Sequence, residues 1–388
     1  MEDINGQLTG HQFLLPAEII VEILSRLSVK SLCRFRCVSK PWRSLITNTK
    51  FIALHARKAL EDKEVFLRRR RVIFNNVKLC GLYSMDLDEF LNHANNHDGL
   101  VTATELDFFR NEFHADDQKH GPPFVPFIYS CNNLLLCSAN CGGLYLVNPA
   151  TREMKKVPRT PLWRPNIRPV ILLSLCGFGF DYSNNEYKVV DGKIYYDCIV
   201  FSVYRLKTDA WRQIECHSYN FGSCFQGIFL NGAIHWLAGK AGVPHSRVIA
   251  TFLLADEEFS EIQLPPIAHT SLAILSVFRD CLCITLRDTD HTFYEFWVMK
   301  EYRVNKSWTK MVSMPYTTIL SHISFSTKSH DLMVYKNSLV MYDFKKESGR
   351  KLQIRDMPEV GNCVGVYVEG LFPLIDHARE GQDRSTST

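Results

Sequence analysis

The stretch LPAEIIVEILSRLSVKSLCRFRCVSKPWRSLI, residues 15–46, has a hydrophobic period that differs from that of most of the chain after it. Its first half predicts an amphipathic helix that follows Pro16, because proline is favoured in the first turn of a helix. Charged residues alternate with an apolar stripe in which the spacing is three or four residues. The stripe consists of Ile19, Ile20, Ile23, Leu24 and Leu27.

Two or three more short helices are expected after the first. Residues 30–37 form the second and bury Leu32 and Phe35. Ser39 is a suitable N-cap for the third, because its side chain can accept a hydrogen bond from the first turn. Residues 51–60 can continue as a fourth. About 45 residues without a metal or a disulfide have a small core, so the apolar stripe either packs on the rest of the chain or binds a partner.

After about residue 64 the pattern becomes that of strands separated by Asn, Asp, Gly and Pro. A weak repeat consists of an apolar strand, a polar turn, and an aromatic or large apolar residue that opens another strand. Its copies end at residues 154, 211, 259, 308 and 350, so the steps are 57, 48, 49 and 42 residues. A recurrence of about 40 to 50 residues is typical of propeller blades. A sixth unit can lie within residues 65–130.

These two periods predict an α+β multidomain chain: a small all-α helical module, then an all-β, propeller-like domain. Closure into a ring removes the sheet edges that five hairpins would otherwise expose. The alternative is an irregular β-sandwich whose hairpins merely resemble one another.

Residues 15–46 closely resemble an F-box, and Phe51 and His55 extend the match in the style of plant members. Ser28 departs from the pattern, because many plant members carry proline there. The resemblance implies a module that docks on a Skp-family adaptor, which links to a cullin. A helical cap on the β domain, with Trp42 in its core, is the alternative. The adaptor-binding residues implied by the resemblance are Leu15, Pro16, Ile19, Ile23, Leu24, Leu27, Leu32, Phe35, Val38 and Trp42.

The remaining chain resembles the F-box associated, kelch-like domain of large plant F-box families. GFGFDYSNNEYKVV (residues 177–190) is the most specific segment, and NPATR (148–152), GAIHWLA (232–238) and FWVMKEY (296–302) support it. Their residues also have plain structural roles: residues 148–149 open a turn, and residues 181–185 form the loop of a hairpin.

Together the two resemblances imply a substrate-recognition subunit of a Skp–cullin–F-box ubiquitin ligase, which binds a target protein through the β domain for ubiquitination and degradation. A scaffold that binds the adaptor without delivering a substrate is the alternative. The expected boundaries are a flexible N-terminus over 1–12, an F-box over 13–58, a β domain over 65–374 and a disordered tail over 375–388.

An enzyme is not expected, and neither is a cofactor or a metal. His235 lies in an apolar strand pattern and is expected to be a satisfied core histidine rather than a catalytic base. Gly177–Gly179 lacks the third glycine of a nucleotide-binding turn. The residues around His93 and His97 indicate a loop, and no cysteine pair has a second pair at zinc-site spacing. A kelch-type oxidase would require a ligand set that the sequence lacks.

Charge and targeting signals favour no other class. Lys and Arg total 45 and Asp and Glu 41, so the net charge of +4 does not indicate nucleic acid. Residues 68–71 are a basic run, interpreted as a nuclear import signal or as the charged edge of a strand. Without a signal peptide or an apolar stretch of about 20 residues, we expect no membrane insertion and a cytoplasmic or nuclear location. Residues 87–121 and 239–247 are the loops expected to contact a target.

Overall fold

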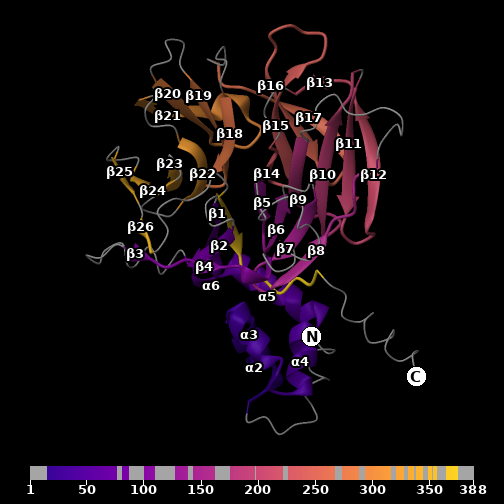
Figure 1. Cartoon of the computed structure of the whole chain (residues 1–388), viewed down its shortest axis with the longest axis vertical. Coiled ribbons are helices and arrows are strands. Elements are labelled where there is room, and N and C mark those ends of the chain that lie inside the picture. The colour runs from indigo at the N-terminus through magenta and orange to yellow at the C-terminus, as the bar shows by residue number, and fades with distance from the viewer. Residues whose placement is uncertain are drawn as a thin grey trace. The chain divides into compact units, whose positions relative to one another are not determined.

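The computed structural model describes residues 15–76, 81–86, 100–109, 127–138, 143–161, 175–196, 198–221, 226–266, 273–287, 293–315, 320–326, 331–335, 338–343, 348–351, 353–355 and 364–374. The chain forms two compact units, whose helices and strands are labelled in Figure 1. The first consists of Met1–Val157, Gln353–Pro358 and Gly365–Thr388, and the second of Pro158–Leu352 and Glu359–Val364.

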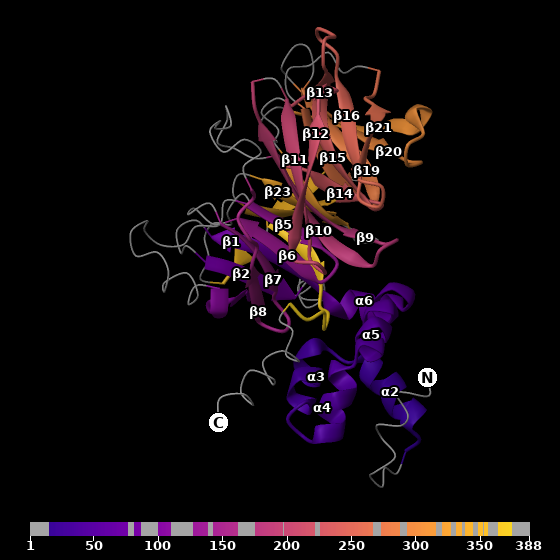
Figure 2. The same cartoon turned by 90° about the vertical axis from the view of Figure 1, so that its right-hand side faces the viewer.

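The first unit begins with helices, in agreement with the hydrophobic period of three to four. Each of the last four has a side-chain N-cap: Ser28, Ser39, Asn48 and Asp62 accept hydrogen bonds from the first turns that follow them. Helix α5 contacts α2, α4 and α6 (Figure 2). The helices are α2 (Ala17–Arg26), α3 (Val29–Phe35), α4 (Lys40–Thr47), α5 (Thr49–Glu61) and α6 (Lys63–Arg69).

The predicted helices over 30–37, after Ser39 and over 51–60 are confirmed as α3, α4 and α5. Helix α6 was not predicted, since the strand pattern was expected to begin near residue 64. Ser28, which departs from the family pattern, is the N-cap of α3, and its hydroxyl accepts the Ser31 amide at 3.4 Å. The helices share one apolar core, made of Ile20, Leu24, Val29, Leu32, Leu45, Ile46 and Phe51, together with Leu371 from the C-terminal part of the chain.

In the described residues of the first unit, two four-stranded sheets and one two-stranded sheet accompany the helices. The first is formed by both ends of the β region, in the order β27-β1-β2-β4, and the second is the meander β5-β6-β7-β8. The short pair β26-β3 is parallel. The strands are β1 (Arg70–Asn76), β2 (Gly81–Asp86), β3 (Leu100–Val101), β4 (Thr104–Glu105), β5 (Phe127–Cys131), β6 (Leu134–Ser138), β7 (Leu144–Asn148), β8 (Glu153–Lys156), β26 (Gln353–Ile354) and β27 (Val364–Val368).

The second unit contains four antiparallel sheets, each built from consecutive strands. The orders are β12-β11-β10-β9, β13-β15-β16-β17 with β14 beside β15, β18-β19-β20-β21, and β22-β23-β24-β25. The strands are β9 (Leu175–Asp181), β10 (Glu186–Ile194), β11 (Ile199–Arg205), β12 (Ala210–Cys216), β13 (Tyr219–Asn220), β14 (Ile228–Leu230), β15 (Ala233–Lys240), β16 (Val248–Leu253), β17 (Glu258–Gln263), β18 (Ala273–Phe278), β19 (Cys281–Arg287), β20 (Phe293–Met299), β21 (Trp308–Pro315), β22 (Leu320–Ser326), β23 (Asp331–Tyr335), β24 (Ser338–Asp343) and β25 (Ser348–Lys351).

Aromatic residues fill the core between the first two sheets of this unit. The Phe201 ring lies 5.7 Å from the Trp236 ring and 6.4 Å from the Phe252 ring. The close approach requires a glycine at position 177, where a Cβ atom would lie 2.6 Å from Ile234 Cγ2. The GFGF segment therefore permits sheet packing, and its glycines line no nucleotide-binding turn.

The repeat is confirmed as the outer hairpin of five sheets. Its copies fall on β7–β8, β11–β12, β16–β17, β20–β21 and β24–β25. Separate four-stranded meanders are the organisation of a β-propeller, whereas a β-sandwich has two stacked sheets. The predicted order of a helical module and a β-propeller domain is confirmed, and the sandwich alternative is wrong.

Candidate functional site

Helix α2 has one buried and one exposed apolar face. Ile20 and Leu24 enter the helical core, with 7% and 2% of their surfaces exposed. On the other side Ile19 and Ile23 are each 47% exposed, and Leu15, just before the helix, is 51% exposed. Side chains four residues apart share one helix face, so these three form an apolar strip. The amphipathic pattern therefore has two apolar faces rather than one.

The connection between α3 and α4 adds a further exposed apolar residue to the module. Val38 is 68% exposed and is followed by the N-cap Ser39, whose hydroxyl accepts the Trp42 amide at 3.3 Å. The Trp42 ring meets the Phe35 ring edge-on at 5.2 Å, and both are half-buried against the helical core. We call Leu15, Pro16, Ile19, Ile23 and Val38 the exposed apolar face.

The ten predicted adaptor-binding residues thus divide into three groups. Five of them form the exposed apolar face. Leu27, Phe35 and Trp42 are half-buried. Leu24 and Leu32 are fully enclosed in the chain's own core, where they hold the helices together. The period of α2 could not separate Ile20 and Leu24 from Ile19 and Ile23, because all four belong to one run of apolar residues.

Ion pairs fix α2 against α5 and the start of α6. Glu22 pairs with Lys58 at 2.8 Å and with Arg26 at 2.9 Å, and Arg26 also reaches Asp62 at 2.5 Å. The hydrogen bonds from Lys58 and Arg26 lower the pKa of Glu22. These side chains are 18–47% exposed, so solvent screens the pairs, their stabilising effect is small and they act mainly on orientation.

A buried arginine joins the helices to the first strand. Arg69, at the end of α6, donates to the carbonyls of Ser25 at 2.6 Å, Leu27 at 2.9 Å and His55 at 2.8 Å. His55 Nε2 donates to the same Leu27 carbonyl at 3.1 Å. Burial, with the nearby Arg69 charge, lowers the pKa of His55 to about 3, so the ring is neutral at physiological pH.

This arrangement corrects the interpretation of the basic run over residues 68–71. Residues 68 and 69 end helix α6, and residues 70 and 71 begin strand β1. The run therefore spans two elements and is not the edge of one strand. Arg69 and Arg70 are 2% and 4% exposed. An import receptor reads exposed side chains, and Arg68 is the exposed one of these four arginines, so the import signal stays a prediction. The clue in the sequence was the apolar context on both sides, from Val65 to Phe74.

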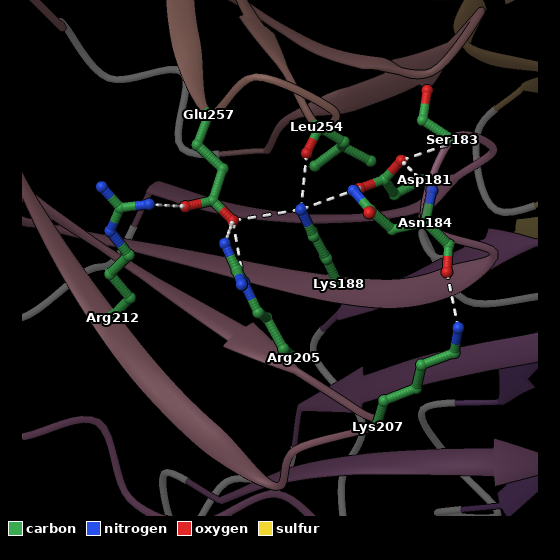
Figure 3. Close-up of polar contacts among 9 residues, drawn as sticks. All are labelled: Asp181, Ser183, Asn184, Lys188, Arg205, Lys207, Arg212, Leu254 and Glu257. Atoms are coloured by element: carbon green, nitrogen blue, oxygen red, sulfur yellow. Dashed lines mark hydrogen bonds and ion pairs between the residues drawn. The ribbon is translucent and has the colours of Figure 1, made fainter.

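A second buried polar cluster lies in the second unit (Figure 3). Lys188 Nζ contacts Asp181 Oδ2 at 2.9 Å, Glu257 Oε1 at 3.0 Å and the Leu254 carbonyl at 2.6 Å. Arg205 and Arg212 complete the contacts of Glu257, at 2.6 Å and 3.0 Å. We call these residues, Asp181, Lys188, Arg205, Arg212 and Glu257, the ion cluster.

Through Lys188, the ion cluster joins the turn after β9 to the turn between β16 and β17. Asp181 Oδ1 also accepts the amides of Ser183 and Asn184, which closes the predicted hairpin loop after β9. Burial acts to raise the pKa of Glu257, but hydrogen bonds from Arg205 and Lys188 together outweigh it and the pKa is lowered. A carboxylate held in this way is a poor general base. The signal missed in the sequence was a lysine within the apolar strand EYKVV.

Of the histidines considered as catalytic or metal-binding residues, only His235 lies among the described residues. His235 is fully buried, with Nδ1 3.0 Å from the Ile228 carbonyl and Nε2 2.8 Å from the Tyr302 hydroxyl, which confirms the core histidine. Burial lowers its pKa to about 4. His93 and His97 lie outside the described residues. Within the part of the chain that the structure describes, no three His, Cys, Asp or Glu residues are grouped to hold a metal, and no helix is long and apolar enough to cross a membrane.

Comparison with known proteins identifies two domains, one over the helices and one over most of the β region. The model of the F-box domain matches residues 13–54, and that of the F-box associated beta propeller domain matches residues 80–369. Among the relatives, the F-box protein CPR1 of Arabidopsis thaliana is 26% identical over 378 residues, which covers 89% of this chain and 85% of the relative. The F-box/kelch-repeat protein At3g23880 of the same organism is 26% identical over 346 residues and covers 85% and 87%. The kelch-like character of this chain stays a prediction.

Similarity to solved structures is remote. TolB from Acinetobacter baumannii aligns with a TM-score of 0.48 and 9% identity over 81% of this chain and 72% of that one.

Proposed function

The chain belongs to the F-box proteins with an associated β-propeller domain, and we propose that it is a substrate receptor of a Skp–cullin–F-box ubiquitin ligase. In this proposal the helices bind a Skp-family adaptor and the β domain binds a target protein. The adaptor links the receptor to a cullin, and the target is ubiquitinated for degradation. The receptor itself does no chemistry and requires no cofactor. The cytoplasm or the nucleus is the proposed setting.

The exposed apolar face is the observation that supports adaptor binding by the helices. The described residues include nine exposed large hydrophobic side chains, and four of them, Leu15, Ile19, Ile23 and Val38, lie within 24 positions of the chain. Scattered apolar residues are normal on a protein surface, but a cluster on one small module indicates a binding surface. The inward face of α2 already has its own partners, so the outward strip is available to another protein.

The structure therefore supports a smaller set of contacts than the sequence indicated. We propose that Leu15, Pro16, Ile19, Ile23 and Val38 contact the adaptor directly, and that Trp42 lies at the margin of this surface. Leu24 and Leu32 act through the fold, because truncating them would open the helical core.

For the target we propose the exposed turns at one end of the sheets of the second unit. Tyr196, between β10 and β11, is 89% exposed, and Val243, between β15 and β16, is 53% exposed. The Ala241 amide donates to the Ser218 carbonyl at 2.9 Å, so the turn between β15 and β16 adjoins the connection between β12 and β13. Such turns can vary without disturbing strand pairing. The loop over 239–247 remains a candidate contact for the target, and most of the loop over 87–121 lies outside the described residues.

The test compares the intact protein with a full-length variant carrying Ile19→Ala and Ile23→Ala. Proximity labelling in cells identifies proteins near each form, and immunoprecipitation measures the adaptor and the cullin. A target should be labelled by both forms, but it should accumulate and lose ubiquitin only with the variant. If the variant lost the adaptor and yet every labelled protein kept its abundance and modification, the protein would be a scaffold and not a degradation receptor.

A further inference from the structure

The helical core is not complete within the helices. Leu371, which lies 325 positions after Ile46, belongs to the same buried apolar cluster and is 2% exposed. Ala150, in the turn between β7 and β8, packs against this cluster as well. Figure 2 shows the C-terminal segment, in yellow, between the strands of the first unit and its helices. The module therefore shares its core with the β region.

The segment that carries Leu371 is fixed by hydrogen bonds on both sides of it. Asn148, fully buried at the end of β7, donates its Nδ2 to the Gly370 carbonyl at 3.1 Å and to the Phe372 carbonyl at 2.9 Å. The Leu374 amide donates to Glu153 Oε2 at 2.8 Å. A side-chain amide that bridges two carbonyls around a buried leucine holds this leucine at one depth in the core.

The fit of the segment is also close. A Cβ atom at position 370 would lie 2.7 Å from Asn133 Cβ, so only glycine allows the approach. Glu369 Oε1 accepts from Arg71 Nε at 3.0 Å, and its own amide donates to the Arg69 carbonyl at 2.9 Å.

Arg69 is the point at which the two ends of the chain meet. Its backbone carbonyl accepts the Glu369 amide, next to the pairing of β27 with β1. Its side chain holds the carbonyls of Ser25 and Leu27, at the end of the helix that carries the exposed apolar face. A shift of the C-terminal segment would therefore be transmitted to α2 through one buried residue.

We propose that the segment Gly365–Leu374 is an integral part of the adaptor-binding module, so that affinity for the adaptor depends on the C-terminal strand being in place. This inference rests on the proposed function. The helices alone have a small core, and removal of Leu371 would leave a hole lined by their apolar side chains. A module that is folded only part of the time binds with an affinity reduced by its folded fraction.

The experiment uses full-length variants and a purified Skp-family adaptor, with affinity measured by calorimetry. Leu371→Asp places a charge in the helical core and should weaken binding by at least about tenfold. The matched control is Pro373→Asp, two residues further on at an exposed position, which should bind within about twofold of the wild type. A second pair compares chains that end at residue 363 and at residue 374, of which only the shorter should lose binding.

Hydrogen exchange distinguishes local from global damage. In Leu371→Asp, exchange should increase over residues 17–61 while β9 to β12 stay protected. Unchanged adaptor affinity in Leu371→Asp, or equal losses in both Asp variants, would overturn the inference. If the wild type itself does not bind the adaptor, the proposed function fails. Unchanged protection of residues 17–61 in Leu371→Asp would independently show that the helices do not depend on the C-terminal segment.

Discussion

Replacement of Ile19 and Ile23 by alanine should weaken adaptor binding and leave the fold intact. Each substitution removes three carbon atoms, worth about 2.4 kcal/mol for complete transfer from water at about 0.8 kcal/mol per carbon. Since each side chain is 47% exposed in the free protein, docking can bury only that share. The loss is therefore about 1.1 kcal/mol per residue, or about 2.3 kcal/mol for both, which raises Kd about 50-fold.

The neighbouring Ile20 provides the matched control. It has the same side chain on the same helix but is 7% exposed. Ile20→Ala should therefore lower the unfolding free energy by about 2–5 kcal/mol. The Ile19→Ala and Ile23→Ala pair should keep the stability of the wild type, because alanine is the better helix former at exposed positions.

Calorimetric titration with a Skp-family adaptor and thermal unfolding of the same preparations measure both effects. Our assignment of the two faces would be refuted by either of two results. One is wild-type affinity in the Ile19 and Ile23 variant. The other is a fall in its stability that matches the fall caused by Ile20→Ala.

Three further predictions concern stability. Lys188→Met leaves two buried carboxylates without their shared cation and should lower the unfolding free energy by about 3–5 kcal/mol. The Arg212 side chain is 64% exposed, so Arg212→Met should lower it by at most about 1 kcal/mol. Similar losses for both variants in chemical denaturation would contradict the central place of Lys188. His55 has a pKa of about 3 in the folded protein, so the unfolded chain gains the proton first as pH falls below about 6.5, and stability should decrease by up to about 1.4 kcal/mol per pH unit between about pH 6.5 and 3. The stability that comes from the neutral His55 ring is fully present above about pH 6.5. In His55→Gln, the slope of the unfolding free energy against pH should be smaller by up to about 1.4 kcal/mol per pH unit. An unchanged slope would show that His55 is not buried as a neutral ring. Gly177→Ala places a methyl group 2.6 Å from Ile234 Cγ2 and should cost about 1–3 kcal/mol, and a melting temperature equal to that of the wild type would show that the two sheets can separate without loss.

Local patterns in the sequence were enough to predict the first four helices and the outer hairpins, but not helix α6. The helix that begins at Ala17 and the N-cap at Ser39 depend on residues within one or two turns. The repeat likewise reflects one hairpin at a time, since each copy contains two consecutive strands and their turn. Such features are encoded over about ten residues, and the hydrophobic period detects them.

Features that join distant residues could not be predicted in this way. The pairing of β27 with β1 and the place of Leu371 in the helical core join segments about 290 or more positions apart. The side chain of the buried Arg69 contacts carbonyls that lie 14, 42 and 44 positions before it. A single sequence carries no period that connects such segments. For the same reason the sequence did not reveal the ion pair of Lys188, because its partner Glu257 lies 69 positions further along.

The sheet β27-β1-β2-β4 has a consequence for synthesis of the chain on the ribosome. β1 ends at Asn76 and its partner begins at Val364, so 288 residues must be added before the sheet can be completed. At about 5–20 residues per second this takes about 15 to 60 seconds. Throughout this interval one edge of β1 presents free amide and carbonyl groups to other chains, which is the condition that favours aggregation. Slower elongation should therefore increase the dependence of this protein on chaperones that cover strand edges.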